Sequence, residues 1–158
     1  MNLKPFNREY LPGVLDFAIN HGVFKEAHGC SVFDRQYVQQ LWEDFFLVDV
    51  GGGQTLWDGD ELVGVIAWVE SPQLYTASPC LDIQLWCVSP AHRDKSGGGR
   101  LIQAAMEYAK PRSLPIMISC GTATPLNVTW SLAQMGFKPS TIDYEWSPFH
   151  GQKNKKGF

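Results

Sequence analysis

The stretch that most constrains the fold is "WCVSPAHRDKSGGGRLIQAAMEYAK", residues 86–110. Its apolar first part ends at Pro90, and a polar loop with three consecutive glycines, residues 97–99, leads directly into an amphipathic segment. A strand that enters a helix through such a turn presents unpaired backbone N–H groups at the positive end of the helix dipole, which suits a phosphate. The alternative is a plain turn in which the glycines only relieve crowding.

Apolar periodicity on both sides of this stretch predicts a mixed α/β layer fold. The patterns are helices at 10–20, 33–46, 100–109 and 126–135, a hairpin at 54–70, and strands at 81–88, 115–120 and 140–146. Asp34 precedes the second helix as a cap, and Thr124 with Pro125 opens the last one. The faces predicted to be buried comprise Leu11, Val14, Leu15 and Ala18, then Tyr37, Val38, Leu41, Trp42 and Phe45, then Leu101, Ala104, Ala105, Tyr108 and Ala109.

Length and composition bound the class of protein. With 158 residues, 44% of them hydrophobic, the chain can form a single domain with a proper core, expected over residues 1–147 and followed by a mobile polar tail, residues 148–158. The formal net charge of -3 gives no overall attraction to nucleic acid or to an anionic membrane, so neither is expected as a partner. No signal-like start and no apolar window of about 18 residues is present, so a soluble, cytoplasmic protein is expected.

The cysteines favour reduced thiols over a disulfide or metal framework. Cys30, Cys80, Cys87 and Cys120 lie far apart with no CxxC pair, and we expect them to be buried. His21 and His28 stand near Cys30, but no partner motif recurs downstream. The sequence therefore predicts no metal site.

Two familiar phosphate-binding loops do not fit the glycine turn. A P-loop requires a lysine and a hydroxyl residue after its last glycine, whereas Arg100 and Leu101 follow Gly99. A dinucleotide fingerprint read from Gly97 would need a third glycine where Ile102 stands. Neither a P-loop site for a nucleoside triphosphate nor a Rossmann site for a dinucleotide is therefore predicted.

The residues around the turn resemble those of the GCN5-related N-acetyltransferase (GNAT) family. Its members show a strand that ends in VxP, a spacer, and [QR]xxGxG[AG] running into a helix. Val88, Pro90 and Arg93 fall in register, and Gly98 and Gly99 take small positions. Ser96 departs from the pattern, because it replaces the first glycine and serine enters positive φ less freely.

The resemblance extends over nearly the whole chain to about Trp146. "LKPF" is similar to the family's opening strand, and "NVTWSLAQMGF" is similar to a late helix that carries an asparagine. The implied fold is α/β, with a mixed, mostly antiparallel central sheet and about four flanking helices in a single domain. The implied activity is acetyl-coenzyme A dependent N-acetyl transfer to an amine-bearing small molecule or peptide.

The resemblance also implies a cofactor site. The strand at Cys87 and Val88 would pair with pantetheine, and Asn127 would lie near the pantetheine arm. The pyrophosphate would lie in a loop made of Arg93, Asp94, Lys95, Ser96, Gly97, Gly98 and Gly99. Arg93 would steady that loop rather than perform chemistry. The N–H of Val88 would stabilise the developing oxyanion, and the chemistry requires no metal.

Asp82 is the predicted general base. It lies eleven residues before Arg93, the separation at which the histone-modifying branch of the family carries its catalytic glutamate. Strand alternation predicts that Asp82, Gln84, Trp86 and Val88 share one face. Partial desolvation would raise the pKa of the carboxyl toward a useful range. The alternative is a structural aspartate near a strand's start.

Three functions stay open at this level: an N-acetyltransferase, an inactive GNAT-fold binding or assembly protein, and a phosphate binder of another fold. The inactive reading arises because Leu132 replaces the tyrosine that often acts as the acid, with Ser131 and Tyr144 as stand-ins. An edge strand near residues 141–146 would allow a homodimer. The aromatic residues Trp42, Phe45, Phe46, Trp57 and Trp68 belong to an acceptor groove or, more simply, to the core.

Overall fold

The computed structural model of the chain describes residues 1–21, 23, 34–73, 77–120 and 126–139. By contacts it divides into two compact units, one of Met1–Val23 with Asp34–Ser119 and one of Phe24–Phe33 with Cys120–Phe158. The predicted last strand with Tyr144, the polar tail, the cap at Thr124 and Pro125, His28 and Cys30 lie outside the described residues. The domain boundary at residue 147 therefore stays a prediction.

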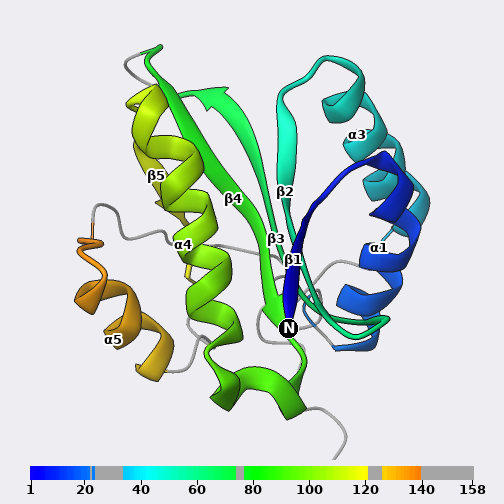
Figure 1. The fold of residues 1–158 in the computed structure, drawn as a ribbon. Coiled ribbons are helices and arrows are strands. Elements are labelled where there is room, and N and C mark those ends of the chain that lie inside the picture. The colour runs from blue at the N-terminus through cyan, green and yellow to red at the C-terminus, as the bar shows by residue number, and fades with distance from the viewer. Residues whose placement is uncertain (22, 24–33, 74–76, 121–125, 140–158) are drawn as a thin grey trace, which may run out of the picture. The chain divides into compact units, whose positions relative to one another are not determined.

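The first unit contains a five-stranded sheet in the order β1-β2-β3-β4-β5. The first four strands pair antiparallel and β5 joins β4 in parallel, which confirms the predicted mixed, mostly antiparallel sheet (Figure 1). The strands are β1 (Asn2–Pro5), β2 (Gly51–Asp58), β3 (Glu61–Pro72), β4 (Pro79–Val88) and β5 (Ile116–Ile118).

Helices cover both faces of this sheet. α4 (Gly97–Ala109) contacts β2, β3 and β4 on one face, and α1 (Leu11–Asn20) and α3 (Arg35–Leu47) pack on the other (Figure 1). Short 3-10 turns complete the unit: η1 (Arg8–Tyr10), η2 (Pro90–Lys95) and η3 (Lys110–Arg112). The second unit contributes α5 (Leu126–Gln134). No helix of the described residues is long and apolar enough to cross a bilayer.

The predicted helical faces are confirmed where a helix packs along its whole length. In α1 all four predicted residues are buried together with Phe17. In α4 the predicted Leu101, Ala105 and Ala109 are buried together with Ile102, whereas the predicted Ala104 and Tyr108 are half-buried. The Asp34 side chain accepts a hydrogen bond from the Tyr37 N–H at 3.0 Å, as a cap should.

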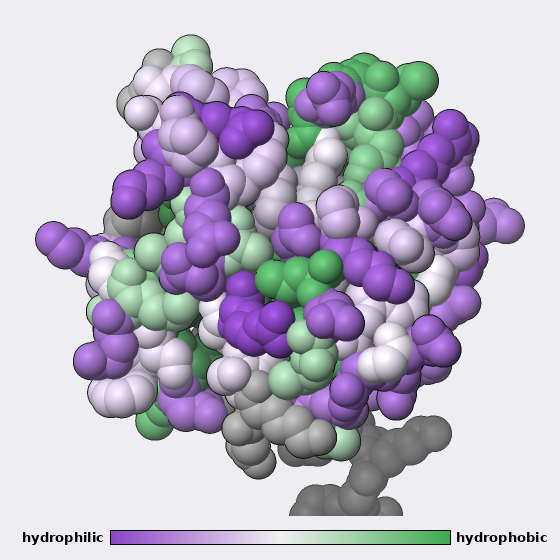
Figure 2. Space-filling view, viewed as in Figure 1, coloured by the Kyte–Doolittle hydropathy of each residue, from purple (hydrophilic) through white to green (hydrophobic). Residues whose placement is uncertain are grey.

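The prediction for α3 is wrong in part, because only Trp42 is buried there and Tyr37 is exposed. In Figure 2 a hydrophobic patch lies over the C-terminal end of α3, where Leu47 and Val48 are 78% and 63% exposed. Cys80 and Cys87 are buried as predicted, but Cys120 is exposed, contrary to expectation. Apolar period alone does not reveal that most apolar residues of α3 stay half-buried or exposed.

A second glycine run, in β2, is explained by close packing on both faces of the strand. A Cβ on Gly51 would lie 2.8 Å from Cβ of Phe45 in α3. A Cβ on Gly52 would point to the other face and lie 2.9 Å from Nε1 of Trp68. These glycines let α3 and the indole approach the backbone of β2 directly.

We expect Gly51→Ala to lower the free energy of unfolding by about 1–3 kcal/mol, because its methyl group meets atoms close to the backbone of Phe45. Gly13→Ala is the matched control, since Gly13 lies in α1 with nothing within 4 Å of an added Cβ. That substitution should stabilise the helix by about 0.5–1 kcal/mol. Urea denaturation measures both, and equal effects of the two substitutions would contradict the packing explanation.

Candidate active site

The sheet forks at the C-terminal half of β4. β5 pairs with β4 only at Leu81, Asp82 and Ile83, whereas β3 follows β4 as far as Val88. In the part of the chain that the structure describes, no strand pairs with the outer edge of β4 beyond Ile83. An open strand edge of this kind can bind an extended ligand as if it were a further strand.

Backbone geometry shows which groups point into the fork. The N–H of Ser89 donates to the carbonyl of Val63 at 2.9 Å, so the opposed residues Gly64 and Val88 form a non-hydrogen-bonded pair. The N–H and carbonyl of Val88 therefore point away from β3, toward the open edge. The same alternation directs the backbone of Trp86 outward, since it lies two residues earlier, opposite Ile66.

The glycine turn brings the start of α4 beside this edge. The N–H of Arg100 is the first to bond within the helix, to the carbonyl of Ser96 at 3.0 Å, so the N–H groups of residues 97–99 have no helical acceptor. The Ser96 side chain makes no capping hydrogen bond. A Cβ on Gly98 would lie 3.4 Å from the ring of Trp86, which places the turn over β4. Three amides at the positive end of a helix provide an anion site next to the strand edge.

Ser96 adopts a left-handed conformation, although serine replaces the glycine of the family pattern and enters positive φ less freely. Its φ and ψ are 59° and 13°, so the backbone follows the path a glycine would take. Left-handed geometry costs a residue with a Cβ about 1–2 kcal/mol. The departure from the family pattern therefore leaves the loop geometry intact and adds strain.

Arg93, Asp94 and Lys95 form the second half of η2, immediately before the turn. The Arg93 Nε donates to the carbonyl of Val88 at 3.2 Å. This bond satisfies one of the two outward-facing groups of Val88 and leaves its N–H directed into the fork. Arg93 thus ties the turn to the strand edge.

Asn127 and Leu132 lie in the second unit, on α5. The carbonyl of Asn127 accepts a hydrogen bond from the Ser131 Oγ at 2.7 Å, and Leu132 is buried. Because a leucine has no proton to give and the Ser131 hydroxyl is engaged by its own helix, α5 supplies no obvious acid from these positions.

Asp82 lies in the half of β4 that still pairs with β5. Burial raises the pKa of its carboxyl, and the hydrogen bond from Gln84 Nε2 to its Oδ2, at 2.8 Å, lowers it in part. A carboxyl with a raised pKa is better suited to accept a proton near neutral pH than an ordinary aspartate.

The prediction that Asp82 shares a face with Trp86 and Val88 is wrong. The register of β4 against β3 shifts between Leu85 and Ile83, so Gln84 is an extra residue. Trp86 and Val88 lie opposite Ile66 and Gly64, and a Cβ on Gly64 would lie 3.2 Å from Leu101 of α4.

Asp82 lies instead opposite Val69, between two residues of β3 that contact Tyr108 of α4. Because neighbouring residues of a strand alternate, Val69 and Asp82 point to the other face, where α1 and α3 pack. A period-2 reading cannot anticipate this, since one extra residue inverts every later position.

The spacing along β4 also identifies a residue that the sequence analysis did not propose as a donor. Asp82 and Val88 are six residues apart, roughly 20 Å at about 3.3 Å per residue. A base and an oxyanion donor that act on one carbonyl group must lie closer than that. The N–H of Trp86 also faces the fork and lies nearer to Asp82.

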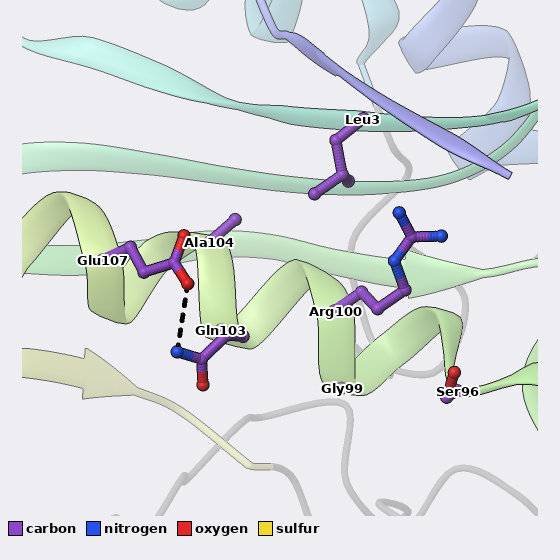
Figure 3. A pocket seen from close by; sticks show the side chains of 7 residues that line it. All are labelled: Leu3, Ser96, Gly99, Arg100, Gln103, Ala104 and Glu107. Carbon is purple, nitrogen blue, oxygen red and sulfur yellow. Dashed lines mark hydrogen bonds between the residues drawn. The ribbon is translucent and has the colours of Figure 1, made fainter.

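A shallow cavity of about 420 Å³ runs along the outer side of α4 near β1 (Figure 3). Leu3 points toward the helix from β1, and Gln103 donates to Glu107 along the helix. The other lining residues are Ser96, Gly99, Arg100 and Ala104. The cavity adjoins the turn on the side of β1, whereas the fork lies on the side of β5.

The aromatic residues considered for an acceptor groove divide by burial. Trp42 and Trp68 are buried, and Trp42 packs on the ring of Phe6 with centroids 5.4 Å apart. Phe45, Phe46 and Trp57 are half-buried. Trp42 and Trp68 therefore belong to the core.

Of the described residues, no group of three or more His, Cys, Asp or Glu could hold a metal ion.

Comparisons with known proteins agree with this geometry. The model of the acetyltransferase (GNAT) family matches residues 20–137 of the chain. The chain belongs to the GNAT family. Its members are acyltransferases, so the protein is an enzyme of that class. Among curated proteins, no sequence matches it.

Solved GNAT structures share the fold at low sequence identity. A predicted acetyltransferase with acetyl-CoA from Clostridium acetobutylicum is 12% identical, with a TM-score of 0.73, 92% of this chain covered and 95% of the other. The aminoglycoside antibiotic 6'-N-acetyltransferase AAC(6')-IG from Acinetobacter haemolyticus is 16% identical, with a TM-score of 0.70 and coverages of 93% and 97%. A ribosomal-protein-alanine N-acetyltransferase from Brucella melitensis biovar Abortus 2308 is 13% identical, with a TM-score of 0.67 and coverages of 93% and 99%.

We expect Gly98→Glu to weaken coenzyme A binding by at least tenfold, because it brings bulk and a negative charge to the first turn of α4. Gln103→Glu is the matched control, since it adds the same charge to the exposed side of the same helix. Isothermal titration with coenzyme A compares the two. An affinity unchanged by Gly98→Glu in a folded protein would show that the turn does not hold the phosphates.

We expect Ser96→Gly to raise the free energy of unfolding by about 0.5–1 kcal/mol, because relief of left-handed strain exceeds the extra entropy of glycine in the unfolded chain. Ser113 also has a positive φ, 55°, but lies at the far end of α4. Ser113→Gly should stabilise similarly, and thermal unfolding measures both. Destabilisation by Ser96→Gly would mean that the serine side chain contributes more than its conformation costs.

Proposed function

We propose that the protein transfers the acetyl group of acetyl-coenzyme A directly to an amine. The observation that carries this proposal is the fork: outward-facing backbone groups of Val88 and Trp86 lie beside the uncapped first turn of α4. Pantetheine amides fit the open edge, and the pyrophosphate fits the N–H groups of residues 97–99. Acetyl-coenzyme A supplies the activated acetyl thioester.

The chain's own groups support a direct transfer. The neutral amine forms a bond to the carbonyl carbon, the carbon–sulfur bond breaks, and the amine proton leaves to a base. The outward N–H of Trp86, which lies nearer to Asp82 than that of Val88, stabilises the negative charge that develops on the carbonyl oxygen, an effect worth about 3–4 kcal/mol for one donor. Asp82 takes the proton through a water, because its side chain is short and lies on the opposite face. The departing thiolate takes a proton from water or from the protonated amine product, because Leu132 has no proton to give.

Binding and turnover test the proposal separately. Titration with coenzyme A should give saturable binding, and thiol release from acetyl-coenzyme A should rise when an acceptor is added. The screen should include sisomicin, which is bound by a structurally similar aminoglycoside acetyltransferase, and a peptide that begins with alanine. Binding without thiol release for any amine would favour a non-catalytic role, and no binding would refute the proposal. A cytoplasmic location, a homodimer and the lack of a nucleic-acid partner stay predictions.

We expect Asp82→Asn to lower turnover about 100-fold at neutral pH while the affinity for coenzyme A is retained, because the amide cannot accept the amine proton. A base works when deprotonated, so the rate falls as the pH drops through its pKa. Since burial raises that pKa, the acidic limb of the wild-type profile should lie above the range of an ordinary aspartate. The variant should lack this limb in a kcat/KM profile against pH.

Gln84→Ala provides a second measurement on the same group. It removes the hydrogen bond that lowers the pKa of Asp82, so the acidic limb should move to higher pH while the maximal rate changes little. A purely structural Asp82 would leave the limb in place in both variants. That outcome would require a base from water or from the acceptor itself.

A further inference from the structure

A buried hydrogen-bond chain joins the β2–β3 hairpin to the loop before the glycine turn. The Ser89 Oγ lies 2.8 Å from His92 Nδ1, and His92 Nε2 lies 3.2 Å from Asp58 Oδ2. Ser89 and His92 are only 7% and 8% exposed, whereas the Asp58 side chain, at the end of β2, is 47% exposed. The sequence analysis assigned no role to any of these three residues.

The chemistry of the three groups assigns the protons. An ionised carboxylate only accepts hydrogen bonds, so His92 Nε2 must carry a proton and donate it to Asp58. In a neutral imidazole Nδ1 is then an acceptor, and the Ser89 hydroxyl donates to it. Each ring nitrogen of His92 has one matched partner, and the two bonds hold the imidazole in one orientation.

These hydrogen bonds act on the segment that leads to the backbone N–H groups proposed to bind the cofactor. His92 lies in η2, and its N–H also donates to the Ser89 carbonyl at 2.9 Å. The His92 carbonyl lies 3.6 Å from where a Cβ on Gly97 would be. The next residue, Arg93, bonds the Val88 carbonyl. Anchoring His92 to β2 therefore fixes η2 in place between the strand edge at Val88 and the start of α4.

The order of serine, histidine and aspartate does not indicate a nucleophile. Ser89 is buried, so a substrate carbonyl could not reach its Oγ, and its N–H is held by Val63 in the sheet. Asp58 bears a negative charge near a site proposed for an anionic cofactor. Electrostatics alone would therefore predict that removing this charge strengthens cofactor binding.

We propose that Asp58, through His92 and Ser89, is a positioning residue for coenzyme A: it orients the glycine turn so that its N–H groups meet the pyrophosphate. This inference rests on the proposed function, because it concerns the same cofactor site. It assigns a role in binding to a hairpin residue that does not itself line the fork.

The test is isothermal titration of the full chain with coenzyme A. Asp58→Ala should weaken binding at least tenfold, which corresponds to about 1.4 kcal/mol. Asp58→Asn should bind within about threefold of wild type, since its amide oxygen still accepts from His92 Nε2. Asp60→Ala is the matched control, because Asp60 is exposed in the same hairpin turn and loses the same charge without contact to His92.

The Asn variant also separates the hydrogen bond from the charge. The other oxygen of Asp58 lies 4.0 Å from the Met1 amino group, and this ion pair is lost equally in Asp58→Ala and Asp58→Asn. Recovery of affinity in Asp58→Asn therefore assigns the effect to His92. Equal affinities for Asp58→Ala and Asp60→Ala would overturn the inference, whereas failure of the wild type to bind coenzyme A would overturn the proposed function.

Hydrogen exchange provides a readout without cofactor. The Arg100 N–H bonds the Ser96 carbonyl and reports whether the first turn of α4 is closed. It should exchange at least tenfold faster in Asp58→Ala than in Asp60→Ala, with Asp58→Asn close to wild type. Equal exchange in the wild type and all three variants would show that the hydrogen bonds through His92 do not position the turn, even if coenzyme A does not bind.

Discussion

The candidate site depends on the pairing of β4 with β3. That pairing continues to Val88, although β5 departs after Ile83, so one edge of β4 is held rigidly while the other is left open. A free strand edge is usually a liability in a soluble protein. Here a helix start and a tethered arginine adjoin it, which makes the edge suitable for an extended, amide-bearing ligand.

Close packing around Val88 makes this arrangement rigid. A Cβ on Gly64 would lie 3.3 Å from one of its methyl groups, and a Cβ on Gly97 would lie 3.4 Å from the other. The same Cβ on Gly97 would lie 2.9 Å from Cδ2 of Leu56. Two glycines therefore let the sheet, the strand end and the start of α4 meet without a side chain between them. The glycine turn serves packing at Gly97 and leaves its amides available for binding, so the two readings of the turn are compatible.

Local patterns predicted the elements of the first unit because each element has a strong apolar period or a turn of defined chemistry. The hairpin at Gly59, the cap at Asp34 and the helix that ends before Pro111 are examples. The predictions that were wrong concern features that depend on partners distant in sequence. The bulge at Gln84 follows from how β4 meets β3, and the burial of α3 follows from how little of it contacts the sheet. The hydrogen bond between His92 and Asp58 joins residues 34 positions apart, and neither residue alone carries a motif.

The extra residue in β4 divides one strand into two segments with opposite facing. Asp82 points toward the side of α1 and α3, while Trp86 points toward α4. Substitutions at Asp82 therefore alter the face on which α1 and α3 pack without changing the side chain that lies under the glycine turn. A deletion of Gln84 would remove the bulge and leave each remaining residue of β4 opposite its present partner on β3.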